Sequence, residues 1–417
     1  MGGNGAVAPH AAMTKTGHQA QRNVVNPADT DADVVTAFHP DSETERTLLF
    51  GSNFVEIQPS TAASTYGSSQ TFTFSNDVDA IGDVYARVIL VGSTASVKAE
   101  LLARIIDRVE VMVGNSTWQT LENADLIALY RTSMDYGSAV ITNLQANGDY
   151  QAPRSATISG STITGGVENI GGTAVDRELW LPLNIFTAGG PKRAHLVAGA
   201  PHQSFRVKLT YRDPGSALGG DPKVELWARQ HIMTNFERDQ IRSNTIAKTL
   251  NLTQHMDFTA SSSSKNLNIE CDSFSLLASH LLITLESEDG GTVDPGAFES
   301  AELLLNTSSH SGQLDAGFMM AATGSSMGLP NFVPNVGPSL ADSDQYQSGA
   351  IAGTRAVFVF PIAATPWGPD GCPFNRFDTI RLKLAFSQAF QGHVSVTCCG
   401  TASAVYAKQA ASLQYHS

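Results

Sequence analysis

Histidine, cysteine and carboxylate side chains can bind metals or activate nucleophiles, but their spacing in this sequence favours neither role. His195 and His202 stand seven residues apart in a Pro- and Gly-rich segment, with no third ligand at metal spacing. We expect both to be solvent-facing loop histidines. Cys398 and Cys399 are adjacent. Neighbouring residues of a strand point to opposite faces, so we expect no shared metal there.

Motifs of common enzyme classes do not emerge either. The chain has no Walker phosphate loop and no H-E-x-x-H helix. Glu56, Glu110 and Glu178 could be acids lining a groove for sugar hydrolysis, but outward-facing strand positions explain them better. We therefore predict a protein that is not an enzyme and that holds neither a cofactor nor a metal.

Three Asn-x-Ser/Thr triplets, at Asn115, Asn251 and Asn306, are candidate glycosylation sites. They act as acceptors only if the chain meets a glycosylation machinery. The first 35 residues contain no apolar core of signal-peptide type. We therefore favour chance occurrence of the triplets.

Composition narrows the class of protein further. The chain has 417 residues, of which 42% are hydrophobic, so it can bury a sizeable core. Its net charge of −13 argues against non-specific binding of nucleic acid. No apolar stretch reaches the length of about 18 residues that a membrane-spanning helix needs. The four cysteines do not form a disulfide framework, and we interpret them as reduced thiols.

Short β runs separated by Gly, Ser, Asn and Pro recur from about residue 46. FRVKLTY at 205–211 alternates apolar and polar residues with the period of a half-buried strand. Many strands joined by long polar loops indicate an all-β sandwich fold.

Two helices interrupt the β pattern. Leu126, Leu129, Tyr130 and Met134 lie at helical spacing in the segment 119–137. A second, charged helix follows Met233, with Thr234 or Asn235 as its N-cap and Glu237 and Asp239 in its first turn. This second helix separates two β-rich halves.

The two halves repeat three segments in the same order, which indicates a tandem duplication. The paired segments are VEVMVGN (109–115) with AELLLN (301–306), WLPLNIF (180–186) with VFPIAAT (359–365), and FRVKLTY (205–211) with IRLKLAF (380–386). Pro182 and Pro361 stand in the second pair, and a strand accepts proline only at a sheet edge or a strand end.

Several blocks together resemble the double jelly-roll major capsid proteins of nucleocytoplasmic large DNA viruses, within the lineage of double-barrel icosahedral capsids. The blocks are 74–90 with Asp79 and Ile81, 105–132, 180–211, 224–240 with Glu237-Arg238, and 357–386 with Cys372, Phe374, Arg376 and Asp378. The Glu237-Arg238 helix is the most specific of them. The resemblance spans roughly residues 46–407 in order.

The resemblance implies two tandem eight-stranded antiparallel jelly rolls with short helices in the connecting loops. We predict an N-terminal arm at 1–45, a first jelly roll at 46–234, a linker helix at 235–243, a second jelly roll at 244–407 and a C-terminal tail at 408–417. Glu237 and Arg238 are expected to orient the second barrel on the first. The two ends are expected to become ordered on assembly.

The function implied by the resemblance is that of a structural major capsid protein. Homotrimers would form pseudo-hexagonal capsomers that tile an icosahedral shell. Its partners would be itself, neighbouring capsomers and minor capsid proteins beneath the shell, close to an internal viral membrane and without direct contact to nucleic acid. The protein would reside in the virion after assembly in the cytoplasm of the infected host cell.

Two alternatives stay open. One is a minor or vertex capsid protein of the same lineage, which copy number in particles would separate. The other is a glycan-binding or glycan-cleaving β-sandwich protein. It would need aromatic platforms and paired carboxylates in one groove, and the aromatic share of 8%, with four Trp in distant segments, weakly disfavours it.

Overall fold

The computed structural model describes the greater part of the chain from residue 50 to residue 415. The described residues are 50–60, 65–93, 105–132, 157–159, 162–164, 175–188, 193–212, 221–261, 264–287, 297–319, 355–363, 367, 371–407 and 409–415. The predicted arm at 1–45 and the end of the predicted helix beyond residue 132 lie outside them. Within this part most residues form antiparallel strands, which confirms the all-β prediction.

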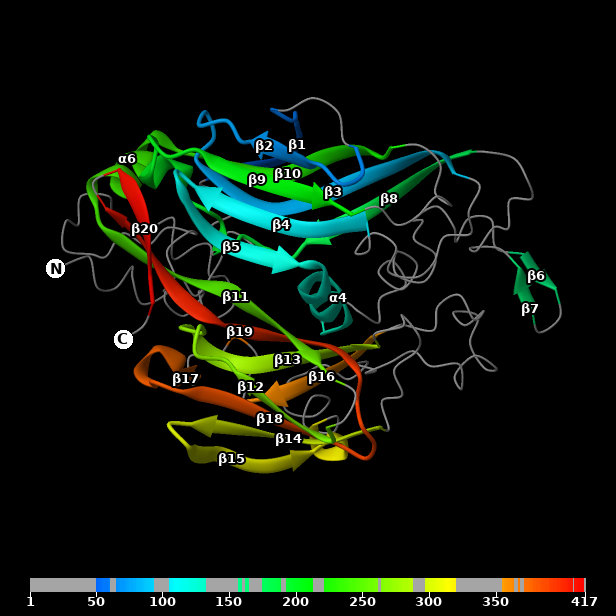
Figure 1. The fold of residues 1–417 in the computed structure, drawn as a ribbon. Helices are drawn as coiled ribbons and strands as arrows, with labels where there is room; N and C mark the ends of the chain where they lie inside the picture. The colour runs from blue at the N-terminus through cyan, green and yellow to red at the C-terminus, as the bar shows by residue number, and fades with distance from the viewer. Residues whose placement is uncertain are drawn as a thin grey trace, which may run out of the picture.

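The first barrel consists of two four-stranded sheets, one with the order β1-β10-β3-β8 and the other with the order β2-β9-β4-β5 (Figure 1). Its strands are β1 Phe50–Ile57, β2 Ser69–Thr73, β3 Ala80–Ser93, β4 Ile106–Val113, β5 Ser116–Glu122, β8 Val175–Leu183, β9 Phe205–Tyr211 and β10 Lys223–Met233. A separate hairpin is formed by β6 Thr157–Ser159 and β7 Thr162–Thr164.

The second barrel lies below the first in Figure 1 and repeats its construction. One sheet has the order β11-β19-β13-β16, with β17 paired to β13 and β20 to β19, and the other has the order β12-β18-β14-β15. Its strands are β11 Ile246–Ala260, β12 Asn266–Glu270, β13 Leu277–Ser287, β14 Phe298–Leu305, β15 Ser308–Asp315, β16 Arg355–Pro361, β17 Cys372–Pro373, β18 Ile380–Phe386, β19 Gly392–Ala407 and β20 Ala410–Gln414.

The strand order is identical in the two barrels. Each barrel has eight main strands, which we number in chain order. One sheet of each barrel then holds the first, eighth, third and sixth strands. The other sheet holds the second, seventh, fourth and fifth. Two antiparallel sheets of this kind form an eight-stranded jelly roll. The prediction of two tandem jelly rolls is confirmed.

The repeated segments of the sequence occupy equivalent strands. Segments 109–115 and 301–306 fall in the fourth strands, β4 and β14, and segments 205–211 and 380–386 are the seventh strands, β9 and β18. Pro182 lies in β8 and Pro361 ends β16, and both of these sixth strands are sheet edges. An edge strand can lack one backbone donor without leaving a neighbour unpaired, which explains why proline is accepted there.

Apolar side chains at alternate positions of the strands form the core of each barrel. Phe205, Val207, Leu209 and Tyr211 on β9 are buried, and the residues between them are half-buried. β19 differs, because Cys398 and Cys399 are adjacent and both fully buried. Its second face is covered by the first barrel, so both faces of this strand exclude water. All four cysteines of the chain are free and buried.

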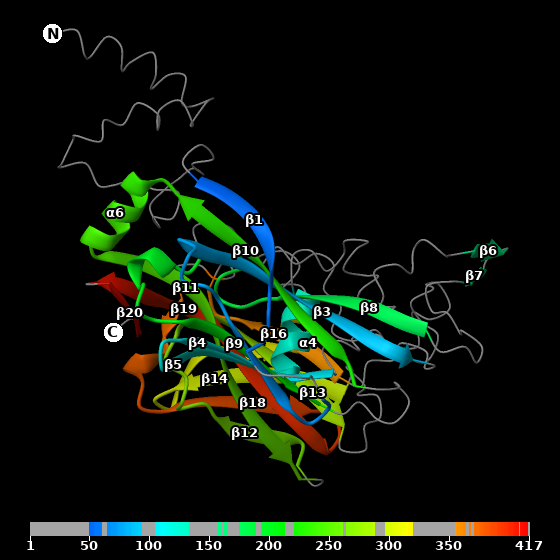
Figure 2. The ribbon, with the colours of Figure 1, turned by 90° about the horizontal axis from the view of Figure 1, so that it is seen from above.

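Short helices connect some of the strands in the described part of the chain. They are α4 Asn123–Thr132, η3 Val197–Gly199, α6 Asn235–Ser243 and η8 Phe374–Arg376. α4 lies between the two barrels, and α6 lies at one end of them, between β10 and β11 (Figures 1 and 2). The N-cap of α6 is Thr234, one of the two predicted, and its hydroxyl accepts the Glu237 N–H. None of the described helices is long and apolar enough to cross a membrane.

The predicted C-terminal tail, 408–417, differs from expectation. Residues 410–414 form β20 within the single chain and pair with β19. The N–H of Ala411 also donates to Oε1 of Gln203, at 2.6 Å, in the first barrel. Within the single chain, the edge of β19 satisfies the backbone groups of this segment.

Candidate functional site at the seam between the barrels

The two barrels meet at a surface that we call the seam, where β5 and α4 of the first barrel pack on β11 and β19 of the second. Alternation on β11 places Thr253, His255 and Asp257 on one face, opposite Cys399, Thr397 and Ser395 of β19. These side chains lie on the outer face of the second barrel. Such a polar face would meet water in an isolated barrel, but here the first barrel covers much of it.

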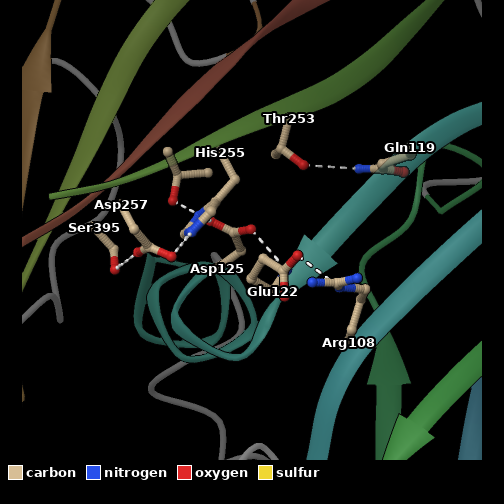
Figure 3. A network of polar contacts seen from close by, with 9 residues as sticks. Arg108, Gln119, Glu122, Asp125, Thr253, His255, Asp257 and Ser395 are labelled. Atoms are coloured by element: carbon tan, nitrogen blue, oxygen red, sulfur yellow. Dashed lines mark hydrogen bonds and ion pairs between the residues drawn. The ribbon is translucent and has the colours of Figure 1, made fainter. Parts of the chain in front are cut away.

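A buried acid–base contact lies at the centre of the seam (Figure 3). Asp125 of α4 is fully buried, and its Oδ1 lies 2.8 Å from Nδ1 of His255. The Thr397 hydroxyl donates to the same oxygen. On the other side of the imidazole, Nε2 lies 3.0 Å from Oδ2 of Asp257, whose side chain is 66% exposed. His255 therefore bridges a buried and an exposed carboxylate.

The charge state of His255 follows from these two neighbours. Burial by itself lowers the pKa of the imidazole, but the hydrogen bonds and charges of Asp125 and Asp257 outweigh it and raise the pKa to about 10. The hydrogen bond from His255 also lowers the pKa of Asp257. The imidazole is thus a cation at neutral pH, and it holds an ion pair across the seam.

Further hydrogen bonds extend this contact into the first barrel. The second oxygen of Asp125 accepts the Glu122 N–H at 2.8 Å, which caps α4. Glu122 in turn pairs with Arg108 at 2.7 Å. Nε2 of Gln119 donates to the Thr253 hydroxyl at 3.1 Å, and its Oε1 accepts the Phe186 N–H at 2.7 Å. Asp125, Glu122 and Gln119 each therefore also have a partner within the first barrel that fixes their side chains at the seam.

A second set of contacts joins residues 193–203 of the first barrel to the end of β19. Nδ1 of His195 lies 3.0 Å from the Tyr406 hydroxyl, which also accepts the Leu196 N–H at 3.4 Å. The His195 ring stacks on Phe205 at 5.1 Å and meets Trp118 edge-on at 5.8 Å. His195 is fully buried, and burial lowers its pKa to about 3.

The prediction that His195 faces solvent is therefore wrong, whereas His202 is exposed as predicted. The Pro- and Gly-rich composition around His195 indicated a loop correctly. It could not show that the second barrel covers this loop. A neutral imidazole suits the position because it can make one hydrogen bond and still pack among aromatic rings.

Lys248 of β11 is another buried titratable group of this region. Its side chain is fully buried, and Nζ donates to the Ala194 carbonyl at 2.6 Å. Burial lowers the pKa of this amine to about 7. The amine therefore links the second barrel to the first, and it is partly deprotonated at neutral pH.

The predicted site residues Glu237 and Arg238 lie on α6, at the end of the seam. Arg238 binds both oxygens of Asp79, with distances of 2.6 Å from Nε and 2.9 Å from Nη2. Asp79 is buried and also accepts the Met233 N–H at 2.7 Å. Glu237 is fully buried. Asp79 belongs to one of the sequence blocks that carry the resemblance, and it lies in the first barrel. The structure thus pairs Arg238 with the first barrel.

The three Asn-x-Ser/Thr triplets lie in two hairpins and one strand. Asn115 is exposed in the β4–β5 turn, and Asn251 is half-buried in β11. Asn306 stands in the β14–β15 turn at φ 48°, and its Oδ1 accepts the N–H groups of Asp378 and Thr379 at 2.9 and 3.1 Å. Asn306 therefore has a structural role, and the chance occurrence of the three triplets stays a prediction.

Two of the three candidate acids, Glu56 and Glu110, do not lie on the same sheet. Glu56 lies on β1 and Glu110 on β4, in different sheets of the first barrel. Glu110 pairs with Lys208 at 2.7 Å on the outer face of its sheet. The side chain of Glu178, in β8, lies outside the described residues. In the part of the chain that the structure describes, no group of three or more His, Cys, Asp and Glu residues could hold a metal ion.

Sequence reasoning missed the seam residues Asp125, His255 and Lys248. A signal was present in β11, where Thr253, His255 and Asp257 alternate on one face. The same alternation is equally typical of a strand face that is exposed to solvent. The arrangement can join two barrels at a fixed orientation through noncovalent contacts, and this is the chemistry that the described residues support.

We expect Tyr406→Phe to lower the free energy of unfolding by about 1–2 kcal/mol, because the Leu196 N–H loses its acceptor between the two barrels. The control is Tyr211→Phe, which removes a buried hydroxyl that donates to Gln70 within the first barrel. Urea denaturation measures both losses, and calorimetry separates them. Tyr406→Phe should give two thermal unfolding transitions, one for each barrel, while Tyr211→Phe should keep a single transition. A single thermal transition in both variants would contradict a role of Tyr406 in holding the two barrels together.

Comparison with solved structures agrees with this architecture. The chain is similar to PBCV-1 VP54 as fitted into a reconstruction of the virophage Sputnik, with a TM-score of 0.64 and 13% identity over 88% of this chain and 97% of that chain. It is also similar to the Faustovirus major capsid protein, with a TM-score of 0.61 and 9% identity over 96% and 98% of the two chains. The major capsid protein of Sulfolobus Turreted Icosahedral Virus gives 0.50 and 11%, over 84% and 96%.

These likenesses define the class of fold. The chain has the double jelly-roll fold that these viral capsid proteins share, along nearly the whole length of each. No protein-family model matches the chain, and no curated protein matches it in sequence.

Proposed function

We propose that the chain is a major capsid protein that forms homotrimeric, pseudo-hexagonal capsomers of an icosahedral shell. The observation that carries the proposal is the seam, which joins two barrels of identical strand order in one chain. Three such chains around a threefold axis present six similar barrels, and a closed rotation keeps the assembly finite. The likeness of fold to viral capsid proteins supports the same role.

The same proposal includes the partners and the location of the protein. The capsomers would contact one another and minor capsid proteins beneath the shell, close to an internal viral membrane and without direct contact to nucleic acid. The protein would be a structural, non-enzymatic component of the virion, assembled in the cytoplasm of the infected host cell. The net charge of −13 is consistent with a shell that does not bind nucleic acid itself.

The solution mass of the full-length chain tests the proposal. Sedimentation or light scattering should give a species of about 133 kDa, three times the chain mass of 44.2 kDa. Electron microscopy of concentrated trimers should then show pseudo-hexagonal particles that tile. A chain that stays a monomer of 44.2 kDa at high concentration would overturn the proposal.

Within this proposal, Arg238 orients the second barrel on the first, and Arg238→Ala should lower the yield of trimer. The variant leaves buried Asp79 without its bidentate partner, a loss of about 2–3 kcal/mol. Arg242→Ala on the same helix is the matched control, because Arg242 is exposed in the last turn. A normal yield of soluble trimer from Arg238→Ala would count against this role.

A further inference from the structure

The last strand, β20, has one strand neighbour in the part of the chain that the structure describes. It pairs with the end of β19 in a register without a bulge. Backbone groups of alternate residues in an antiparallel strand point to opposite sides. The Ala411 N–H donates to Oε1 of Gln203, so the groups of Ala411 and Leu413 point away from β19. The outer edge of β20 therefore presents the N–H and carbonyl of Leu413 and the carbonyl of Ala411.

This outer edge lacks the features by which proteins usually protect a sheet edge, which are charged residues, prolines and bulges. Apart from β2, every other edge strand of the four main sheets contains a charged residue or a proline. The edge of β2 is partly covered, since the Ser60 N–H donates to the Thr71 carbonyl at 2.8 Å. The sequence of β20, AASLQ, contains neither a charge nor a proline. Such an edge is suited to accept a further strand.

The chain that precedes β1 enters the fold at the end of the molecule where β20 lies. Phe50, the first residue of β1, pairs with Met233, whose N–H donates to Asp79 at 2.7 Å. The Asp79 carbonyl accepts an N–H of η3, and η3 packs against Tyr406 of β19, beside β20. Figures 1 and 2 show α6, which follows Met233, and β20 at the same end of the molecule. A few direct contacts thus connect the start of β1 with β20.

The sequence before β1 contains a run with the composition of a short strand. Apart from TLLF, which leads into β1, this run is VVTAF at 34–38. Val, Thr and Phe favour strands, and Pro40 is a residue type that ends them. Residues 39–49 join the run to β1, and an extended chain of that length spans up to about 36 Å. A linker this short gives the run an effective concentration on the order of millimolar at the edge of β20, which favours it over a second copy.

We propose that residues 34–38 of the same chain add a strand to the outer edge of β20. The added strand binds the backbone groups of Leu413 and the carbonyl of Ala411. Its apolar side chains pack beside Leu413 and Tyr415, which is 43% exposed. The pairing also protects the edge of β20 against pairing with other chains. This inference goes beyond the proposed function, because it concerns the single chain whatever its oligomeric state.

Amide hydrogen exchange of the full-length chain, resolved to single residues by fragmentation in the mass spectrometer, tests the proposal. The double variant Val35→Pro/Thr36→Pro removes two neighbouring donors, so whichever side of the run faces β20 loses a hydrogen bond. The Leu413 amide should exchange at least about tenfold faster in this variant than in the wild type. The Ser412 amide faces β19 and should exchange at the same rate in both, which makes it the internal reference.

The matched control is Ala11→Pro/Ala12→Pro, which places two prolines in the same arm outside the run. Its Leu413 amide should exchange at the wild-type rate. Equal Leu413 exchange in the wild type and in Val35→Pro/Thr36→Pro would overturn the proposal, because residues 34–38 would then not cover the edge.

Cross-linking tests whether the added strand comes from the same chain. Ala37→Cys/Gln414→Cys is treated with a short bismaleimide, to which the four native cysteines, all buried, react slowly. The product on a denaturing gel should be a single cross-linked chain of 44.2 kDa. Ala12→Cys/Gln414→Cys should give this product at least about tenfold more slowly. A main product of about 88 kDa, twice the chain mass of 44.2 kDa, would assign the strand to a second copy and overturn the proposal.

The outcomes for this inference and for the proposed function are distinguishable. A wild-type chain that stays a monomer would count against the capsomer, while Leu413 exchange and the cross-link within one chain would still decide where residues 34–38 bind. A wild-type trimer with a rapidly exchanging Leu413 amide and no cross-link within one chain would overturn this inference and leave the capsomer proposal standing.

Discussion

Replacing Asp125 with alanine is expected to lower the free energy of unfolding by about 3–5 kcal/mol, the range for removing one partner of a buried ion pair. The substitution deprives His255 of its buried counter-charge and the Thr397 hydroxyl of its acceptor. It also leaves the Glu122 N–H uncapped at the start of α4. Because all three losses fall at the seam, the two barrels should also unfold less cooperatively.

The matched control is Asp257→Asn, which removes the other carboxylate from the same imidazole. The Asp257 side chain is 66% exposed, so water screens its charge and the expected loss is about 1 kcal/mol or less. Asp125→Asn should fall between the two, because an amide keeps the shape and part of the hydrogen bonding. Urea denaturation at one protein concentration measures all three. Equal losses for Asp125→Ala and Asp257→Asn would show that burial of the ion pair contributes nothing.

The pH dependence of stability should reverse between two single variants, His255→Gln and Lys248→Met. The folded pKa of His255 is raised to about 10, so its stabilisation is complete below about pH 6.5 and declines as the pH rises toward 10. The folded pKa of Lys248 is lowered to about 7, so its contribution is complete above about pH 10.5 and declines as the pH falls toward 7. Between pH 7 and 8.5 the two contributions oppose each other.

In the wild-type chain the contributions of these two groups should therefore nearly cancel over this interval. Lys248→Met removes the rising contribution, and its stability should fall by up to about 2 kcal/mol from pH 7 to 8.5. His255→Gln removes the falling contribution, and its stability should rise by a similar amount. Thiols of the unfolded chain begin to lose protons toward pH 8.5, and burial raises the folded pKa values of all four cysteines, so they lower the stability of the wild type and of both variants alike in this interval. The slope of each variant is therefore taken relative to that of the wild type. Chemical denaturation at several pH values measures the slopes, and slopes of the same sign in both variants would contradict this assignment.

Local pattern was enough to predict the β architecture. Strand alternation in 205–211 gave β9 with the buried face that the sequence indicates. Proline lacks a backbone donor, so Pro182 and Pro361 are expected at a sheet edge or a strand end, and both lie on edge strands. The three repeated segments occupy equivalent strands because register and topology depend on the same spacing of apolar residues. Thr234 likewise caps α6 for a reason contained in a few neighbouring residues.

The seam was determined by contacts between residues far apart in the chain. Asp125 and His255 are 130 positions apart and Arg238 and Asp79 are 159 apart, so no local period connects them. His195 was predicted to be exposed because its neighbours are typical of a loop, and only the packing of β19 against that loop buries it.

The sequence by itself therefore determined the strands, their repetition and the class of fold, since these depend on which side chains alternate along a strand. The tertiary structure alone decided which polar faces are covered and which remain free. Covering a strand face changes neither its alternation nor its composition. It does change the free energy of every charge on that face, as the altered pKa values of His255 and Lys248 show.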